Sequence, residues 1–166
     1  MNTPTETPMV SGQAIRESPL GLDLDDAQCQ ALANVCSLLG VATGNMLLEE
    51  GRSDDTLYVI VSGCLEVVKP SGGGSTVSLG YLRPGDVAGI MGFVDGVKHT
   101  AGIRAQETCE LIALTRPDLE TLLEKDPGLV YQVMRSIVRS AHRILGRMNN
   151  QFVEMSNYIS HQHGRY

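Results

Sequence analysis

The segment from Val87 to Ala101 concentrates the residues of this chain that could bind a small ligand. It contains glycines at positions 89, 92 and 96, and it ends on the run Lys98-His99-Thr100-Ala101. Backbone N–H groups in a glycine-rich loop can hold an anion, and the three polar side chains before Ala101 could add contacts. The alternative is a loop that is kept only as part of the scaffold, and the residues alone favour that second interpretation.

Residues suited to catalysis or to metal binding are scarce in the rest of the sequence. The four cysteines, Cys29, Cys36, Cys64 and Cys109, form no CxxC pair and lie in apolar segments. A free cysteine in such a segment is usually a small, buried apolar side chain. No nucleophile has a plausible partner base, and no P-loop or metal-ligand motif is present. The sequence therefore predicts a protein that is not an enzyme and that holds no metal.

Short strands and glycine-rich turns fill the chain from about residue 45 to residue 115, and they must position this loop. Apolar runs predict strands at 46–48, 57–61, 65–68, 77–79, 100–105 and 109–114, and the third and fourth of these form a hairpin. Such short, regularly spaced strands favour a small barrel or jelly roll. Before them, acidic residues followed by apolar periodicity predict a helix over residues 27–39. Residues 1–18, rich in Thr, Pro, Ser and Glu, are predicted to be disordered.

A long helix follows Asp126-Pro127, and its apolar residues repeat every seven positions. Four heptads in register are typical of a helix that packs along a second helix. Residues 131–159 would span roughly 43 Å at 1.5 Å per residue, which is more than a small domain needs for its own cover. The alternative is a helix that folds only over its own domain. We expect a parallel homodimer with an interface of Met134, Val138, Ala141, Leu145, Met148, Phe152, Met155 and Ile159.

The net charge of the chain limits the partners that we expect. The sequence holds 13 Lys and Arg against 19 Asp and Glu, which gives a net charge of −6. Proteins that grip a nucleic-acid backbone usually carry a basic surface, so no DNA binding is expected from this chain. No apolar run approaches 18 residues, and the N-terminus lacks the pattern of a signal peptide. We therefore expect a cytoplasmic protein that does not contact membranes.

Four short glycine-containing motifs occur in a fixed order along the chain. They are the strand and turn from Gly44 to Gly51, the strand from Leu57 to Gly63, the turn Leu82-Arg83-Pro84-Gly85-Asp86, and the strand from Thr100 to Ala105. Together they resemble the cyclic nucleotide-binding domain family, the effector domain of catabolite-activator-type regulators, over about residues 20–160. The resemblance implies a mainly β fold with flanking helices. It implies a β-roll of the jelly-roll type at 19–126 and a dimerisation helix with a short tail at 127–166.

The phosphate-binding cassette of that family is altered here at its chemical centre. The family pattern is roughly Phe-Gly-Glu, in which the Glu binds the ribose, and nine residues later Arg-Ser/Thr-Ala, in which the Arg binds the phosphate. Here the corresponding residues are Ala88-Gly89-Ile90 and His99-Thr100-Ala101. Ile90 cannot accept a hydrogen bond, and a neutral His99 lacks the guanidinium fork. The ligand-binding positions that the resemblance implies are Gly89, Ile90, Met91, Gly92, His99, Thr100 and Ala101, and we expect ordinary cyclic AMP binding to be lost.

Two functions follow from this altered cassette. The first is a non-enzymatic regulatory or signalling module that acts by protein–protein contact, as a homodimer or with another signalling protein, and whose ligand site is vestigial or altered. The alternative is a sensor of a cyclic mono- or dinucleotide that uses non-standard contacts. A cyclic nucleotide is the one cofactor under consideration. A DNA-reading regulator of the family would need a further domain, for which about seven residues remain after Ile159.

Overall fold

The computed structural model describes residues 9–163 and is built around two antiparallel four-stranded sheets. The first sheet has the order β1-β8-β3-β6, with bounds of Ser37–Val41, Cys109–Thr115, Thr56–Ser62 and Val87–Ala88. The second has the order β2-β7-β4-β5, with bounds of Met46–Leu48, Gly102–Ala105, Leu65–Pro70 and Thr76–Leu82. This arrangement is the predicted β-roll, and the fold class is confirmed.

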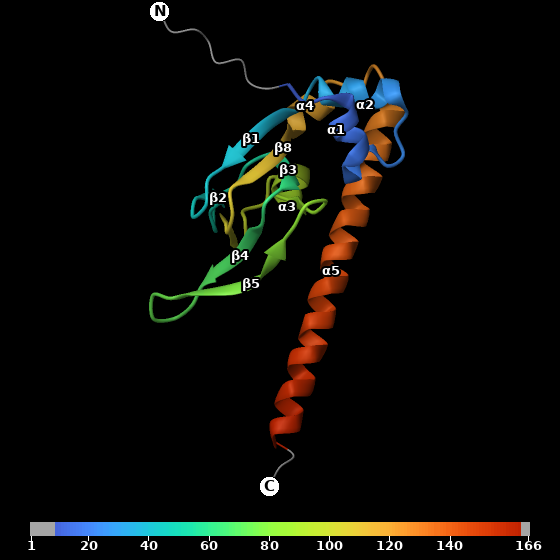
Figure 1. Ribbon diagram of the computed structural model, residues 1–166. Helices are drawn as coiled ribbons and strands as arrows, with labels where there is room; N and C mark the ends of the chain where they lie inside the picture. The colour runs from blue at the N-terminus through green and yellow to red at the C-terminus, as the bar shows by residue number, and fades with distance from the viewer. Residues whose placement is uncertain (1–8, 164–166) are drawn as a thin grey trace, which may run out of the picture.

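Helices gather at one end of the β-roll and continue into a single long rod (Figure 1). Near the N-terminus are α1 (Gly12–Glu17), a short 3-10 helix η1 (Pro19–Gly21) and α2 (Asp26–Ala33). The short helix α3 (Ile90–Asp95) lies in the cassette segment, and α4 (Arg116–Glu120) follows β8. The last helix, α5 (Pro127–His163), starts beside α1 and α2 and projects beyond the β-roll. No helix among the described residues combines the length and the apolar content that a membrane crossing needs.

The alternation of side chains along β3 divides the core into two parts. Leu57 and Val59 face the helical end, where they pack with residues such as Leu32 of α2 and Val133 of α5. Their neighbour Ile60 faces the space between the two sheets instead. Successive residues of a strand point to opposite faces, so one strand can serve both clusters. The cassette is therefore anchored on a strand that is fixed from both sides.

The predicted disorder of residues 1–18 is wrong for the part of that segment that the structure describes. Ser11 caps α1 by accepting a hydrogen bond from the Ala14 N–H, and Val10 and Ile15 are buried in the helical cluster. The polar composition of the segment gives little sign of these apolar residues, and α1 packs against α2 and η1. Residues 1–8 lie outside the described residues.

The predicted helix over residues 27–39 is also too long. A capping box between Asp25 and Gln28 starts α2 as expected, but the helix stops at Ala33. From Ser37 the chain is strand β1, paired with β8 so that Leu38 lies opposite Ile112. Pairing with a strand more than seventy positions away overrides the local helical pattern.

The start of α5 is fixed by hydrogen bonds to Asp126. Its carboxylate accepts the backbone N–H of Leu129 at 2.9 Å and the side-chain amide of Gln28 at 3.0 Å. Further along, Arg139 pairs with Asp23 and Arg147 pairs with Asp86 of the turn before β6. These contacts hold the first part of α5 to the β-roll, and they place the helix beside the cassette.

Candidate ligand-binding site

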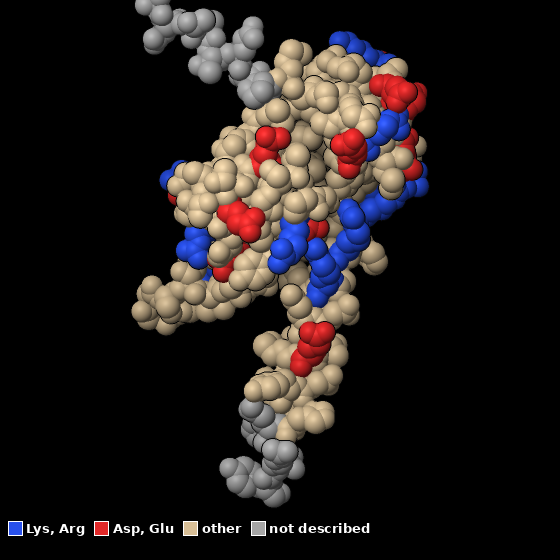
Figure 2. All heavy atoms as spheres, in the orientation of Figure 1, with Lys and Arg blue, Asp and Glu red and all other residues tan. Residues whose placement is uncertain are grey.

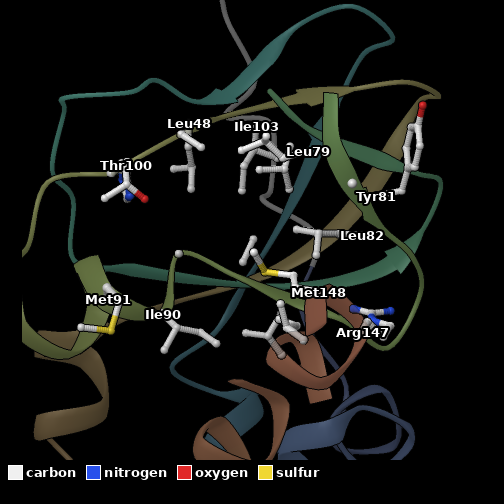
Figure 3. A pocket seen from close by; sticks show the side chains of 18 of the residues that line it. Leu48, Leu79, Tyr81, Leu82, Ile90, Met91, Thr100, Ile103, Arg147 and Met148 are labelled. Atoms are coloured by element: carbon white, nitrogen blue, oxygen red, sulfur yellow. The ribbon is translucent and has the colours of Figure 1, made fainter. Parts of the chain in front are cut away.

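A cavity of about 570 Å³ lies between the second sheet, the cassette segment and α5. In Figure 3, Leu48, Leu79 and Ile103 point into it from β2, β5 and β7. Ile90 and Met91 of α3 lie on the opposite side, and Met148 of α5 projects between the two walls. Three parts of the sequence thus enclose one space whose walls are mostly hydrocarbon.

The backbone of the cassette requires glycine where it leaves β6. Gly89 has a φ of +80°, and a Cβ built on it would lie 2.5 Å from the carbonyl oxygen of Thr56. A side chain is excluded both by the left-handed conformation and by this approach to β3. Gly96 ends α3 in the same left-handed region, with a φ of +65°. The two glycines therefore bound a six-residue helix that forms one wall of the cavity.

The side chain of His99 is mostly buried, and the residue lines the cavity. Its backbone is fixed by hydrogen bonds with Arg52 at 2.7 Å and with Gly51 at 2.8 Å. Its Nε2 lies 3.4 Å from Asp54 Oδ1, and among the described residues this nitrogen has no hydrogen-bond partner. A Cβ on Gly92 would lie only 3.0 Å from the His99 ring. The imidazole is therefore packed beneath α3.

Asp54 also contacts Tyr58 of β3 below the cassette. The Tyr58 hydroxyl donates to Asp54 Oδ2 at 3.2 Å. Burial, followed by the charge of Asp54, raises the pKa of Tyr58 to about 12, so the phenol stays protonated at neutral pH. Asp54 thus contacts His99 and Tyr58 beneath the cassette and does not line the cavity.

The structure brings the predicted cassette positions together around this cavity. Gly89, Ile90, Met91, His99, Thr100 and Ala101 line it, whereas Gly92 is buried behind the wall against Asp54 and His99. On α5, Ile144 lines the cavity and Leu145 does not.

The residues of α5 that line the cavity were largely missed from the sequence. They are Ile144, Arg147, Met148 and Gln151, which share one face of the helix. Their spacing of three or four was visible, but the heptad pattern assigned Met148 to the dimer interface alone. On the sheet side, Leu79 and Tyr81 of the β5 hairpin were also missed, because a hairpin pattern does not say what its face covers.

The charged groups at the cavity are all cationic, and they differ in their partners. Arg147 Nη1 lies 3.0 Å from Asp86 Oδ2, so its charge is largely neutralised. Lys98 is exposed at the cassette end and forms no ion pair with any part of residues 9–163. Within the described chain no Asp or Glu lines the cavity. The site therefore combines an apolar interior with one unpaired positive charge at its edge.

The fold agrees with the comparison to known proteins. Residues 39–126, more than half of the chain, match the model of the cyclic nucleotide-binding domain, and the chain belongs to that family. It is 26% identical over 143 residues to the cAMP-activated global transcriptional regulator CRP of Salmonella typhimurium, covering 85% of this chain and 68% of that protein.

Solved structures show the same fold. A cyclic nucleotide-binding domain from Methylobacillus flagellatus superposes with a TM-score of 0.80 at 18% identity, covering 89% of this chain and 86% of that one. The c-di-GMP-responsive regulator CLP of Xanthomonas campestris superposes with a TM-score of 0.67 at 18% identity, covering 80% and 65% of the two chains. At these identities the likeness is one of fold.

Proposed function

We propose that this protein is a non-enzymatic, cytoplasmic regulatory module that acts by protein–protein contact and whose cavity no longer binds cyclic AMP in the manner of its family. The observation that carries the proposal is the pair Ile90 and His99. Ile90 places hydrocarbon in the cavity where the family pattern has a carboxylate, and the His99 ring points to Asp54.

The loss of these two anchors accounts for a large part of the affinity that a cyclic nucleotide would need. A hydrogen bond to a charged group contributes roughly 1.5–3 kcal/mol, so two of them correspond to a factor on the order of 10²–10⁴ in Kd. The ribose hydroxyls and the cyclic phosphate would also lose their own hydration inside an apolar cavity. We expect cyclic AMP to bind no more tightly than about 1 mM.

The second part of the proposal is a parallel homodimer formed by α5. Val138, Leu145, Phe152 and Met155 lie on the predicted interface and each exposes more than half of its surface. Burying a large apolar side chain contributes roughly 1.5–3 kcal/mol, which favours a second copy of the helix as the cover. Between residues 148 and 161 the only Asp, Glu, Lys or Arg is Glu154, and Figure 2 shows how little charge this part of α5 carries.

The proposed interface differs from the expected one at its N-terminal end. Met134 packs partly against the core of its own domain, and Ala141 is also partly buried. The interface that we propose therefore becomes continuous from Val138 onward and includes Met148 and Ile159. With a net charge of −6, protein partners are favoured over DNA.

Calorimetric titration with cyclic AMP tests the ligand half of this proposal. The unmodified protein should give no saturable heat below about 1 mM. The double variant Ile90→Glu with His99→Arg should gain at least 100-fold in affinity, because it restores both anchors on an intact backbone. Ile90→Leu is the matched control and should give no saturable heat with cyclic AMP.

The same titration distinguishes the alternative functions. Low-micromolar binding of cyclic AMP by the unmodified protein would overturn the proposal. Saturable micromolar binding of c-di-GMP would instead support the sensor of a cyclic dinucleotide.

A further inference from the structure

We propose that the cavity binds a medium-chain fatty acid, with the alkyl chain between the sheet and Met148 and the carboxylate at Lys98. The inference rests on the proposed function in one respect, namely that cyclic AMP does not occupy this site. It identifies the ligand as a single-chain monoanion, a class that none of the family resemblances implies.

The walls of the cavity suit an alkyl chain better than a nucleotide. Leu48, Leu79 and Ile103 form the sheet side, and Ile90 of α3 and Met148 of α5 close the other sides (Figure 3). A volume of about 570 Å³ is within the range of small-molecule sites. An alkyl chain has no polar groups that need partners there, and the flexible thioether of Met148 can adapt to its shape.

The charge at the edge of the cavity favours one carboxylate over a phosphate. Arg147 is already paired with Asp86 at 3.0 Å. The carbonyl oxygen of Thr100 accepts from Lys69 at 2.7 Å, and Lys69 is also paired with Glu50 at 3.1 Å. Lys98 is the one lysine or arginine lining the described cavity that lacks a carboxylate partner. A single unpaired ammonium neutralises a monoanion, and the exposed Thr100 hydroxyl beside it can donate to the same head group.

Titration of the full chain with dodecanoate tests the proposal, and octanoate and dodecanol serve as comparison ligands. Dodecanoate should bind once per chain in the micromolar range. Octanoate should bind on the order of 100-fold more weakly, because each buried CH₂ corresponds to roughly fourfold in affinity. Lys98→Met should weaken dodecanoate binding by up to about fivefold and leave dodecanol binding unchanged, since dodecanol carries no charge.

Three further variants locate the bound chain. Lys125→Met removes an exposed lysine outside the cavity and should leave dodecanoate binding unchanged. Leu79→Glu places a carboxylate in the cavity wall at a half-exposed strand position, where the fold tolerates it, and should abolish binding. Phe152→Asp alters the exposed apolar side of α5 and should leave the one-to-one binding intact.

Several results would overturn the inference. They are no heat with dodecanoate up to 1 mM, equal effects of Lys98→Met and Lys125→Met, or binding that survives Leu79→Glu and is lost with Phe152→Asp. A parallel titration with cyclic AMP separates the two proposals. Micromolar binding of cyclic AMP refutes the proposed function. If neither cyclic AMP nor dodecanoate gives saturable heat, only the fatty-acid site is refuted.

Discussion

The two halves of α5 share one heptad repeat but meet different surroundings. In the first half, Leu129, Val133 and Ile137 are completely buried in the helical core, and even Ser136 and Ser140 are covered. From Ala141 onward no residue of the described helix is buried. The first half thus belongs to the β-roll, whereas the second half extends away from it (Figure 1).

The difference shows that residues outside the heptad columns do most to attach α5 to its own domain. The buried residues Leu129, Val133 and Ile137 lie on a face offset from the exposed column of Val138 and Leu145. The first half therefore has two apolar faces, one inside the domain and one outside. The second half keeps only the outer face, apart from the few residues that line the cavity.

The largest effect should come from the inner face of the first half. Ile137→Ala should lower the free energy of unfolding by about 2–5 kcal/mol, because it leaves a cavity among fully packed neighbours. Leu145→Ala, one helix face away and exposed, should change the unfolding of a dilute sample by less than about 0.5 kcal/mol. Urea denaturation followed by circular dichroism gives both values, and equal losses would contradict the division of the helix.

The outer face of the second half should govern self-association. Leu145→Asp with Phe152→Asp should convert the dimer to a soluble monomer whose β-roll stays folded, since neither side chain belongs to the core. Two carboxylates in a paired apolar interface would be buried without partners. Light scattering reports the mass, and Asn150→Asp on the opposite face is the control. A monomeric unmodified protein at micromolar concentration would refute the dimer.

A smaller gain should come from the glycine near the start of the second half. Gly146→Ala should stabilise α5 by up to about 1 kcal/mol, because a Cβ there meets no atom within 4 Å. Gly92→Ala is the control with the opposite expected sign. It should destabilise the folded protein, since its Cβ would lie 2.8 Å from the carbonyl oxygen of Asp54. Thermal melting of the two variants should move in opposite directions, and a lower melting temperature for Gly146→Ala would show that α5 needs flexibility at this point.

The smallest effect should be the pH dependence of the capped end of α5. Hydrogen bonds from Gln28 and then from Leu129 lower the pKa of Asp126 below its ordinary value of 3.8. The stabilisation is therefore complete above pH 3.8 and is lost as the pH falls through the lowered pKa of the folded protein. Asp126→Asn should remove this contribution from an acid titration of stability. An acid titration of stability that is the same for Asp126→Asn and for the unmodified protein would contradict this role of the cap.

The β-roll could be predicted from the sequence because strand patterns and turn glycines are local signals. Much of the cavity could not be predicted, because its walls come from segments that are far apart in the sequence. Strands such as Thr56–Ser62 are bounded by residues like Gly63, which fix each turn within a few positions. The end of α2 and the start of β1 depend on the distant partner β8, and the ordered α1 depends on contacts to α2 and η1. The sequence aligns the cassette with the family pattern, but it does not specify the rotamer that directs His99 to Asp54. Met148 lines the cavity because of the direction in which α5 leaves the domain, and the sequence does not give that direction.

Met148 belongs both to the wall of the cavity and to the heptad column of the proposed dimer. An occupant of the cavity and a second copy of α5 would therefore compete for, or jointly order, the same thioether. Thermodynamic linkage makes such a coupling reciprocal: the factor by which occupancy changes the association constant of two chains is the factor by which association changes the affinity of the cavity. A binding isotherm measured at one protein concentration would then shift at another, and the abundance of the protein would itself set the ligand level to which it responds.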